Sequence, residues 1–216
     1  MLSRSVLIVE DYALMRELLA AALTARGFQV DTAASADEAR AAFSDGDHDA
    51  LVLDLDLGDG PDGFDVAQAL LARSPHTAIV FLTNLPDPRF ADRDPADLPT
   101  GVAYLRKTVL EDVETLVTAL DRVLRGASTE EFRHDLDPDR PLARLTRKQL
   151  AVLRLVAEGL SNLQIAQRRG VTEKAIEDTF GRACAALGLR TTPGGNQRVT
   201  AARQFLTALG RNAPSD

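Results

Sequence analysis

The sequence has few cysteines and histidines and no long apolar run. Its 216 residues include one cysteine, Cys184, which excludes an intrachain disulfide and a zinc site built from cysteines. Three scattered histidines, His48, His76 and His134, argue against a dedicated transition-metal site. No apolar stretch approaches the roughly 18 residues of a membrane-spanning helix, and no signal-peptide pattern opens the sequence. These absences predict a cytoplasmic protein with no membrane partner.

The overall composition, with 45% hydrophobic and 26% charged residues, is typical of a globular protein. The charge is unevenly distributed along the chain. Residues 1–140 carry 13 Lys and Arg against 27 Asp and Glu (net −14), whereas residues 141–216 carry 12 against 5 (net +7). This asymmetry predicts two domains with different partners, and the basic half is the candidate for nucleic-acid binding.

The first 125 residues alternate short apolar runs with helical patterns. The runs are too short for helices and rich in Val, Ile and Leu, so we expect strands buried on both faces. The expected strands are residues 5–10, 28–34, 51–57, 78–83 and 101–107. The expected helices are residues 14–26, 36–43, 64–73 and 111–124. This alternation predicts an α/β fold with a doubly wound, five-stranded parallel sheet.

One helix is missing from the alternation. Between Thr83 and Gly101 the chain has four prolines, which remove backbone donors and fix φ. We expect at most one or two helical turns there, near Arg89 to Arg93. Residues 126–144 are polar and carry two prolines, which is typical of an interdomain linker.

From residue 145 onward the pattern is helical throughout. Thr146 and Ser161 each begin a capping-box pattern, and Thr172 is a further N-cap residue. The predicted organisation is a first domain over residues 1–125, a linker over 126–144 and a second, all-α domain over 145–212.

Polar and charged residues lie toward the carboxyl ends of four predicted strands. In a parallel sheet these ends meet at one edge, where open α/β sheets place their ligands. The residues that meet there are Glu10, Asp11, Asp54, Thr83 and Lys107. Three carboxylates in one cleft require a cation, and their oxygen ligands suit Mg²⁺. A metal, a carboxylate nucleophile, a hydroxyl and a lysine are the parts needed to transfer a phosphoryl group onto a carboxylate.

Residues 4–125 resemble the receiver domain of response regulators. The resemblance rests on residues 6–11, 49–54, 81–83 and 104–107, which hold the strand-end acids, the threonine and the lysine. It implies that Asp54 accepts a phosphoryl group from a histidine kinase. One departure is that Gly63 comes nine residues after Asp54, one more than is usual in receivers.

The same resemblance implies roles for the neighbours of Asp54. Mg²⁺ would bind Glu10, Asp11, Asp54 and the backbone carbonyl of Asp56. The resemblance also implies that Thr83 swings toward the phosphoryl oxygen, that Tyr104 turns inward with it, and that Lys107 pairs with the phosphoryl group.

A hydrolytic enzyme is the remote alternative for this pocket. Asp54 and Asp56 have the Asp-x-Asp spacing of haloacid-dehalogenase-type phosphohydrolases, in which the second Asp protonates the leaving group. That family usually carries the motif on its first strand, whereas Asp54 lies on the third predicted strand. A three-residue motif outside its structural context is a weak signal. We therefore expect no enzyme activity beyond turnover of the receiver's own phosphoryl group.

Residues 145–166 resemble a LuxR-type helix-turn-helix domain, most specifically in Gly159 to Asn162 followed by Ile165 and Ala166. The resemblance implies that the helix from Glu173 enters the major groove of double-stranded DNA and that the last helix, from Arg198, makes homodimer contacts. The candidate DNA-contact residues are Arg168, Arg169, Lys174, Glu177, Asp178 and Arg182, with Arg190 as a further phosphate contact.

The acidic character of this helix leaves a second interpretation open. Glu177 and Asp178 oppose an approach to phosphates, although a carboxylate can accept from a cytosine amino group.

The main prediction is a two-component response regulator of the NarL/FixJ type that controls transcription through DNA. The alternative is a receiver whose helical domain binds a protein partner instead.

Overall fold

The computed structural model describes residues 4–45, 48–58, 60–189 and 196–211. The chain forms two compact units, Met1–Asn84 with Leu98–His134, and Leu85–Asp97 with Asp135–Asp216. The candidate phosphate contact Arg190 lies outside the described residues. No helix in the described part of the chain is both long and apolar enough to cross a membrane.

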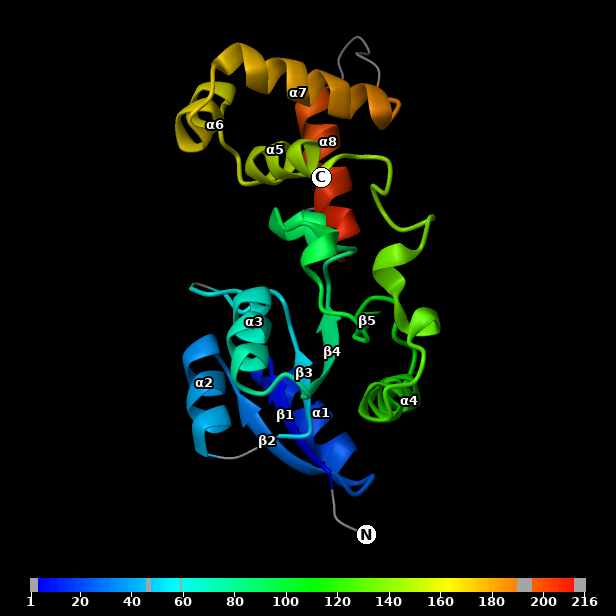
Figure 1. The fold of residues 1–216 in the computed structure, drawn as a ribbon. Coiled ribbons are helices and arrows are strands. Elements are labelled where there is room, and N and C mark those ends of the chain that lie inside the picture. Colours follow the sequence, from blue (N-terminus) through cyan, green and yellow to red (C-terminus); the bar gives the residue numbers. More distant parts are fainter. Residues whose placement is uncertain (1–3, 46–47, 59, 190–195, 212–216) are drawn as a thin grey trace. The chain divides into compact units, whose positions relative to one another are not determined.

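The first unit is built on a five-stranded parallel sheet (Figure 1). Its strands are β1 (Ser5–Val9), β2 (Gln29–Ala33), β3 (Ala50–Leu53), β4 (Ala78–Thr83) and β5 (Ala103–Arg106). Every neighbouring pair is parallel, and the order is β2-β1-β3-β4-β5. The order places β3 in the centre, between β1 and β4. The predicted doubly wound sheet is confirmed.

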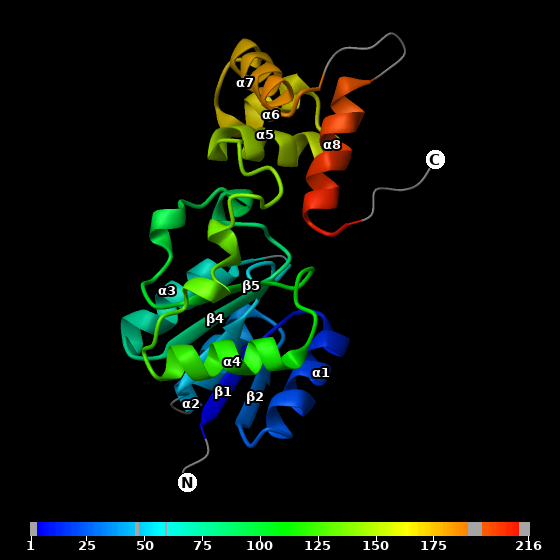
Figure 2. The ribbon, with the colours of Figure 1, turned by 90° about the vertical axis from the view of Figure 1, so that its right-hand side faces the viewer.

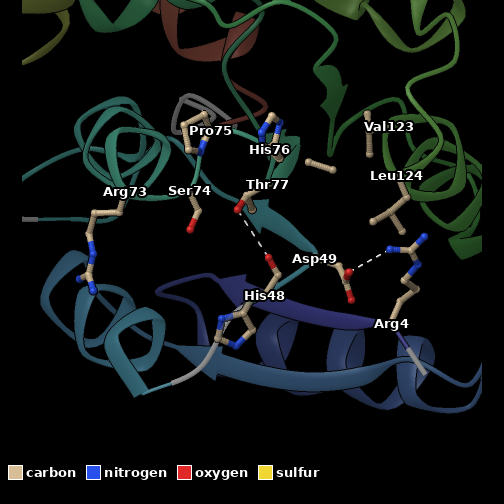
Figure 3. A pocket seen from close by; sticks show the side chains of 11 residues that line it. Arg4, His48, Asp49, Arg73, Ser74, Pro75, His76, Thr77, Val123 and Leu124 are labelled. Atoms are coloured by element: carbon tan, nitrogen blue, oxygen red, sulfur yellow. Dashed lines mark hydrogen bonds and ion pairs between the residues drawn. The ribbon is translucent and has the colours of Figure 1, made fainter. Parts of the chain in front are cut away.

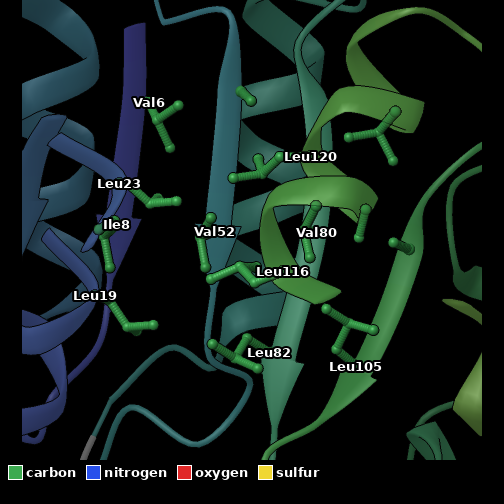
Figure 4. Close-up of a cluster of buried hydrophobic side chains, with 14 of the residues drawn as sticks. Val6, Ile8, Leu19, Leu23, Val52, Val80, Leu82, Leu105, Leu116 and Leu120 are labelled. Atoms are coloured by element: carbon green, nitrogen blue, oxygen red, sulfur yellow. The ribbon is translucent and has the colours of Figure 1, made fainter. Parts of the chain in front are cut away.

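Helices cover both faces of this sheet (Figure 2). One face carries α1 (Ala13–Thr24) and α4 (Val113–Leu124), and the other carries α2 (Ala36–Asp45) and α3 (Gly63–Arg73). Beneath α1 and α4 the strands contribute Val6, Ile8, Val52, Val80, Leu82 and Leu105, which meet Leu19, Leu23, Leu116 and Leu120 from the helices (Figure 4). Burial on both faces is the reason that these strands are nearly continuous apolar runs.

The third strand is shorter than its apolar run. β3 ends at Leu53, whereas we expected it to extend to residue 57. Leu55 and Leu57 are only 1% and 7% exposed, so the apolar pattern continues because these side chains fill the core beneath a loop. A short apolar run indicates burial but does not say whether the backbone pairs with a neighbour.

The connection from β4 to β5 contains no α-helix, as its prolines predict. It has two 3₁₀ turns, η1 (Pro88–Ala91) and η2 (Pro95–Asp97), of which the first overlaps the expected position. The segment Leu85–Asp97 packs within the second unit, although it lies between two strands of the first. This departs from a first domain that runs unbroken over residues 1–125.

The described residues of the second unit form four further α-helices (Figure 1). They are α5 (Arg147–Ala157), α6 (Asn162–Arg169), α7 (Glu173–Ala186) and α8 (Gln197–Ala208). The capping boxes predicted at Thr146 and Ser161 are present, since each hydroxyl accepts from the N–H three residues on and that residue's side chain accepts from the cap N–H. Val152, Leu155, Ile165 and Ile176 are among the side chains that form the core of these helices.

The first part of the predicted linker packs beside β5. Arg133 forms an isolated parallel bridge with Tyr104, and the backbone N–H of Arg106 donates to Nδ1 of His134 at 3.1 Å. Phe132, in the 3₁₀ turn η3 (Glu130–Phe132), is buried in the core beneath α4. These residues therefore cover the open edge of the sheet, which would otherwise expose unpaired backbone groups.

Candidate functional site

The sheet brings the predicted pocket residues together at one edge. Glu10 and Asp11 follow β1, Asp54 follows β3, Thr83 ends β4 and Lys107 follows β5. One carboxylate oxygen from each of the three acids lies within 4.8 Å of the other two. The Lys107 Nζ atom is 2.5 Å from Glu10 Oε2 and 2.6 Å from Asp54 Oδ2. The convergence expected from the strand order is present.

Burial and charge act against each other in this pocket. Burial raises the pKa of the Asp54 carboxyl, and the nearby Lys107, the Asp56 N–H and the Thr83 hydroxyl oppose this rise without cancelling it. Burial likewise raises the pKa of Glu10, despite its hydrogen bond from Lys107. Burial would lower the pKa of Lys107, but attraction to Asp54 and Glu10 outweighs it, and the pKa is raised. Lys107 is therefore a permanent cation. It faces two carboxyls whose ionised forms further positive charge would stabilise.

The donor set fits a hard divalent cation. Three carboxylates face one ammonium, so the pocket has excess negative charge when all three acids are ionised. Mg²⁺ binds oxygen ligands and keeps several waters, and the exposed side chain of Asp11 offers such a position next to solvent. A cation held here would favour the ionised forms of Asp54 and Glu10, the opposite of what burial does.

The backbone around Asp54 is held by close packing. The Asp56 N–H donates to Asp54 Oδ1 at 3.1 Å, and the Gly63 N–H donates to the Leu55 carbonyl at 3.2 Å. A Cβ atom on Gly63 would lie 2.1 Å from the Asp54 carbonyl oxygen, which no side chain permits. Gly63 therefore lies against the backbone of Asp54, where only a residue without a Cβ atom fits, even though the loop before it is one residue longer than usual.

Arg16 fixes the acid pair at the end of β1. Its Nη1 atom donates to the backbone carbonyls of Glu10 at 2.7 Å and Asp11 at 3.2 Å. Because Arg16 lies in the first turns of α1, it ties the start of this helix to the backbone from which both carboxylates project.

Tyr104 lies on β5 and is fully buried. Its ring packs against Phe81 with centroids 6.2 Å apart, and Phe81 packs against Phe64 at 5.8 Å. Tyr104 is thus held in a buried position by a row of aromatic contacts.

A cavity of about 510 Å³ lies at the opposite edge of the sheet (Figure 3). Its lining residues Arg4, Asp49 and Thr77 immediately precede β1, β3 and β4. Arg4 and Asp49 form an ion pair at 2.9 Å. None of the predicted pocket residues lines this cavity, so the acidic edge remains the candidate site.

The exposed face of α7 carries the predicted recognition residues. Glu177, Asp178 and Arg182 are exposed, and Lys174 is 75% exposed at its side chain. Lys174 pairs with Glu177 at 3.5 Å and with Asp178 at 3.1 Å. Glu177 and Asp178 thus form ion pairs with a lysine of their own helix, which the charge pattern alone did not indicate.

The predicted arginines of the helical unit also have intramolecular partners. Arg168 pairs with Glu158 at 3.1 Å, and Arg169 pairs with Asp92 at 3.3 Å. Arg182 donates to the Thr179 hydroxyl at 3.5 Å. The contacts of Arg168 and Arg182 are exposed, where such interactions are weak, whereas the pair between Arg169 and Asp92 is half-buried.

Asp87 is 1% exposed and pairs with Arg89 and Arg140. No role for this residue was predicted from the sequence. The flanking Pro86 and Pro88 indicated only an irregular backbone. No local pattern signals a partner 53 residues away in the sequence.

Comparisons with known proteins match one family to part of each half of the chain. The family model for the response regulator receiver domain matches residues 6–93, and that for bacterial regulatory proteins of the luxR family matches residues 143–188. Tyr104 and Lys107 lie beyond the first match, so their place in the pocket rests on the geometry.

Curated relatives match most of the chain. The DNA-binding transcriptional activator DevR/DosR of Mycobacterium tuberculosis is 31% identical over 194 residues, which cover 86% of this chain and 84% of that protein. The transcriptional regulatory protein TdiR of Thauera aromatica is 29% identical over 197 residues, covering 87% and 82%. RcsB from Salmonella enterica serovar Typhimurium, solved bound to promoter rprA, shares the fold with a TM-score of 0.61 at 20% identity over 95% of this chain and 98% of that one.

Proposed function

Because this chain belongs to the two-component response regulators that join a receiver domain to a luxR-family DNA-binding domain, we propose that phosphorylation of Asp54 controls its action on DNA. The observation that supports Asp54 most strongly is its position beside Lys107, with Nζ 2.6 Å from its carboxylate, and within 4.8 Å of Glu10 and Asp11. Asp56 has an exposed side chain outside this cluster, and the family is one of regulators, so a phosphohydrolase is disfavoured.

The proposed reaction transfers a phosphoryl group from a histidine kinase. An Asp54 carboxylate oxygen forms a bond to phosphorus as the bond from phosphorus to the kinase imidazole nitrogen breaks, and the imidazole keeps the electron pair. Lys107 then exchanges its contact with the Asp54 carboxylate for one with a phosphoryl oxygen. The raised pKa of Lys107 ensures that it carries its charge at neutral pH.

We propose that Glu10, Asp11, Asp54 and the backbone carbonyl of Asp56 hold Mg²⁺ in this reaction. The ion would supply positive charge next to the transferring phosphoryl oxygens. Arg16 and the packing of Gly63 keep the backbone of these ligands in place before the ion binds.

Thr83 and Tyr104 are the proposed switch residues. The buried Thr83 hydroxyl already contributes to stabilising ionised Asp54, so it is placed to follow a phosphoryl oxygen on the same carboxylate. Tyr104 lies on the neighbouring strand β5, where it pairs in register with Phe81, two residues before Thr83. A change in this pair would shift a two-state equilibrium of the receiver.

The second domain is proposed to bind double-stranded DNA through α7, as a homodimer that uses α8. The candidate contacts are Arg168, Arg169, Lys174, Glu177, Asp178 and Arg182. The luxR-family match favours this interpretation over a helical domain that binds only a protein partner.

We expect duplex binding by the full chain to weaken as the salt concentration rises. Replacing Lys174 or Arg182 with Ala should weaken binding across sequences and reduce the slope of log K against log[salt] by about 1 for each phosphate interaction that the substitution removes. A salt series with a pool of genomic duplex fragments measures both quantities. The matched control is Arg40→Ala, a half-exposed arginine on α2 in the other unit.

This proposal fails if neither the phosphorylated nor the unphosphorylated chain binds any fragment in a salt-sensitive way. It would also fail if the Lys174 and Arg182 variants matched the Arg40 variant in affinity and slope. Capture of a protein partner by the helical domain under those conditions would support the alternative function.

A further inference from the structure

The segment Leu85–Asp97 is anchored in the second unit by a buried ion cluster. Both carboxylate oxygens of Asp87 accept from Arg89, at 2.8 Å and 2.6 Å, and Oδ2 also accepts from Arg140 Nε at 2.8 Å. Burial would raise the pKa of Asp87, but the two arginines outweigh it and the pKa is lowered. Removing either arginine would leave this buried carboxylate with one partner fewer at a large cost in stability, so the cluster anchors the segment in the second unit.

Arg89 connects this cluster to the start of the helical domain. Its Nη1 atom donates to the carbonyl of Ala143 at 3.2 Å and to that of Leu145 at 2.5 Å. Leu145 lies just before Thr146, the N-cap of α5. One guanidinium therefore joins the segment to the backbone that sets where α5 begins.

Phe90 provides an apolar contact with the last helix. Its ring stacks on Phe205 of α8 with centroids 5.4 Å apart and an interplanar angle of 24°, and both side chains are buried. The next acid, Asp92, has φ of 60° and pairs with Arg169 at the end of α6. Residues 87–92 thus contact α5, α6 and α8, including one candidate DNA-contact arginine.

The link from this anchor back to the pocket is short and stiff. Asn84 alone separates Thr83, the end of β4, from Leu85. Pro86 and Pro88 have fixed φ, and each restricts the residue before it to extended conformations. Asp87 is accordingly extended, with φ of −164° and ψ of 170°. Residues 85–88 therefore have few backbone rotations that could absorb a displacement of Thr83, and the displacement is passed on to Phe90.

We propose that Leu85–Asp97 is a covalent relay from the acidic pocket to the helical domain. A displacement of Thr83 moves a stiff connection whose far end is bound to α5 and α8, so the helical domain responds to the state of Asp54. This relay rests on the proposed phosphorylation of Asp54. It takes the place of the fourth helix that the alternation of strands and helices leads one to expect.

The test is hydrogen exchange of the full chain with and without phosphorylation by acetyl phosphate and Mg²⁺. In the wild-type chain we expect the exchange rates of α5 and α8 amides to change by about 5-fold or more on labelling, the lower end of typical allosteric couplings. Inserting Gly-Gly between Asn84 and Leu85 should reduce this change to less than about 2-fold, because flexible residues absorb the displacement.

Two further variants complete the test. The same Gly-Gly insertion between the exposed Asp94 and Pro95 leaves the path from Thr83 to Phe90 intact and should retain the wild-type response. Arg89→Ala keeps the chain length but removes the hydrogen bonds to Ala143 and Leu145 and the ion pair with Asp87. It should also abolish the response, and it carries the test if the first insertion variant does not fold.

A labelled wild-type chain with unchanged exchange in α5 and α8 would overturn the relay alone. So would an insertion after Asn84, or an Arg89→Ala variant, that responds like the wild type. A chain whose intact mass shows no added phosphoryl group would instead overturn the proposed function, and the relay with it.

Discussion

Asp54→Asn should lose at least about 100-fold of the Mg²⁺-dependent labelling by acetyl phosphate that the wild-type chain shows, because an amide oxygen is a poor nucleophile and the acyl phosphate cannot form. The substitution keeps the size of the side chain and its place beside Lys107. Intact-mass spectrometry of the full chain measures the labelled fraction directly, and circular dichroism reports whether the fold is kept.

Asp56→Asn is the matched control for this result. Asp56 is two residues away and exposed, and it reaches Asp54 through its backbone N–H, which the substitution leaves unchanged. Labelling of this variant should stay within about 3-fold of the wild type. If Asp56→Asn lost the label while Asp54→Asn kept it, the phosphoacceptor would be Asp56 and the proposed role of the pocket would be wrong.

Asp87→Ala should destabilise the second unit by about 3–5 kcal/mol, because it leaves two partly buried arginines without their common carboxylate. Urea unfolding followed by hydrogen exchange in α8 measures this loss. Asp94→Ala, at an exposed position of the same segment, should cost about 1 kcal/mol or less. Equal effects of the two substitutions would show that the buried cluster does not hold the segment.

The difference between wild type and Asp87→Ala should depend on pH in one direction. The pKa of Asp87 is lowered in the folded chain, so its contribution is fully present above the pKa of the unfolded chain and is lost as the pH falls through the folded value. The two proteins should therefore differ by the same amount at pH 7 and pH 5. The gap should narrow only below about pH 4, where an unfolded aspartate begins to take up protons.

Most of the fold could be predicted because the patterns that determine it are local. The strand 78–83 was expected with the bounds it has, and Thr146 and Ser161 begin their helices with the capping boxes that the sequence shows. The pocket could be predicted for a related reason. Once the strands are known to be parallel and their order is known, the residues at their carboxyl ends are known to lie next to one another.

The differences arise where long-range packing decides. Leu55 and Leu57 gave the pattern of a strand but fill the core from a loop. The segment after Thr83 was expected to be irregular, yet nothing local indicated that Phe90 stacks on Phe205, which is 115 residues away in the sequence. The ion pair of Arg169 with Asp92 likewise depends on a neighbour 77 residues away that only the folded chain brings close.

The central claim is that phosphorylation of Asp54 controls binding to DNA. Its most direct test compares the duplex affinity of the full chain before and after labelling by acetyl phosphate, at one fixed salt concentration, for the wild type and for Asp54→Asn. We predict an affinity change of about 5-fold or more in the wild type and none in the variant. A wild-type affinity that is the same in both states, or a variant that responds as the wild type does, would contradict the account.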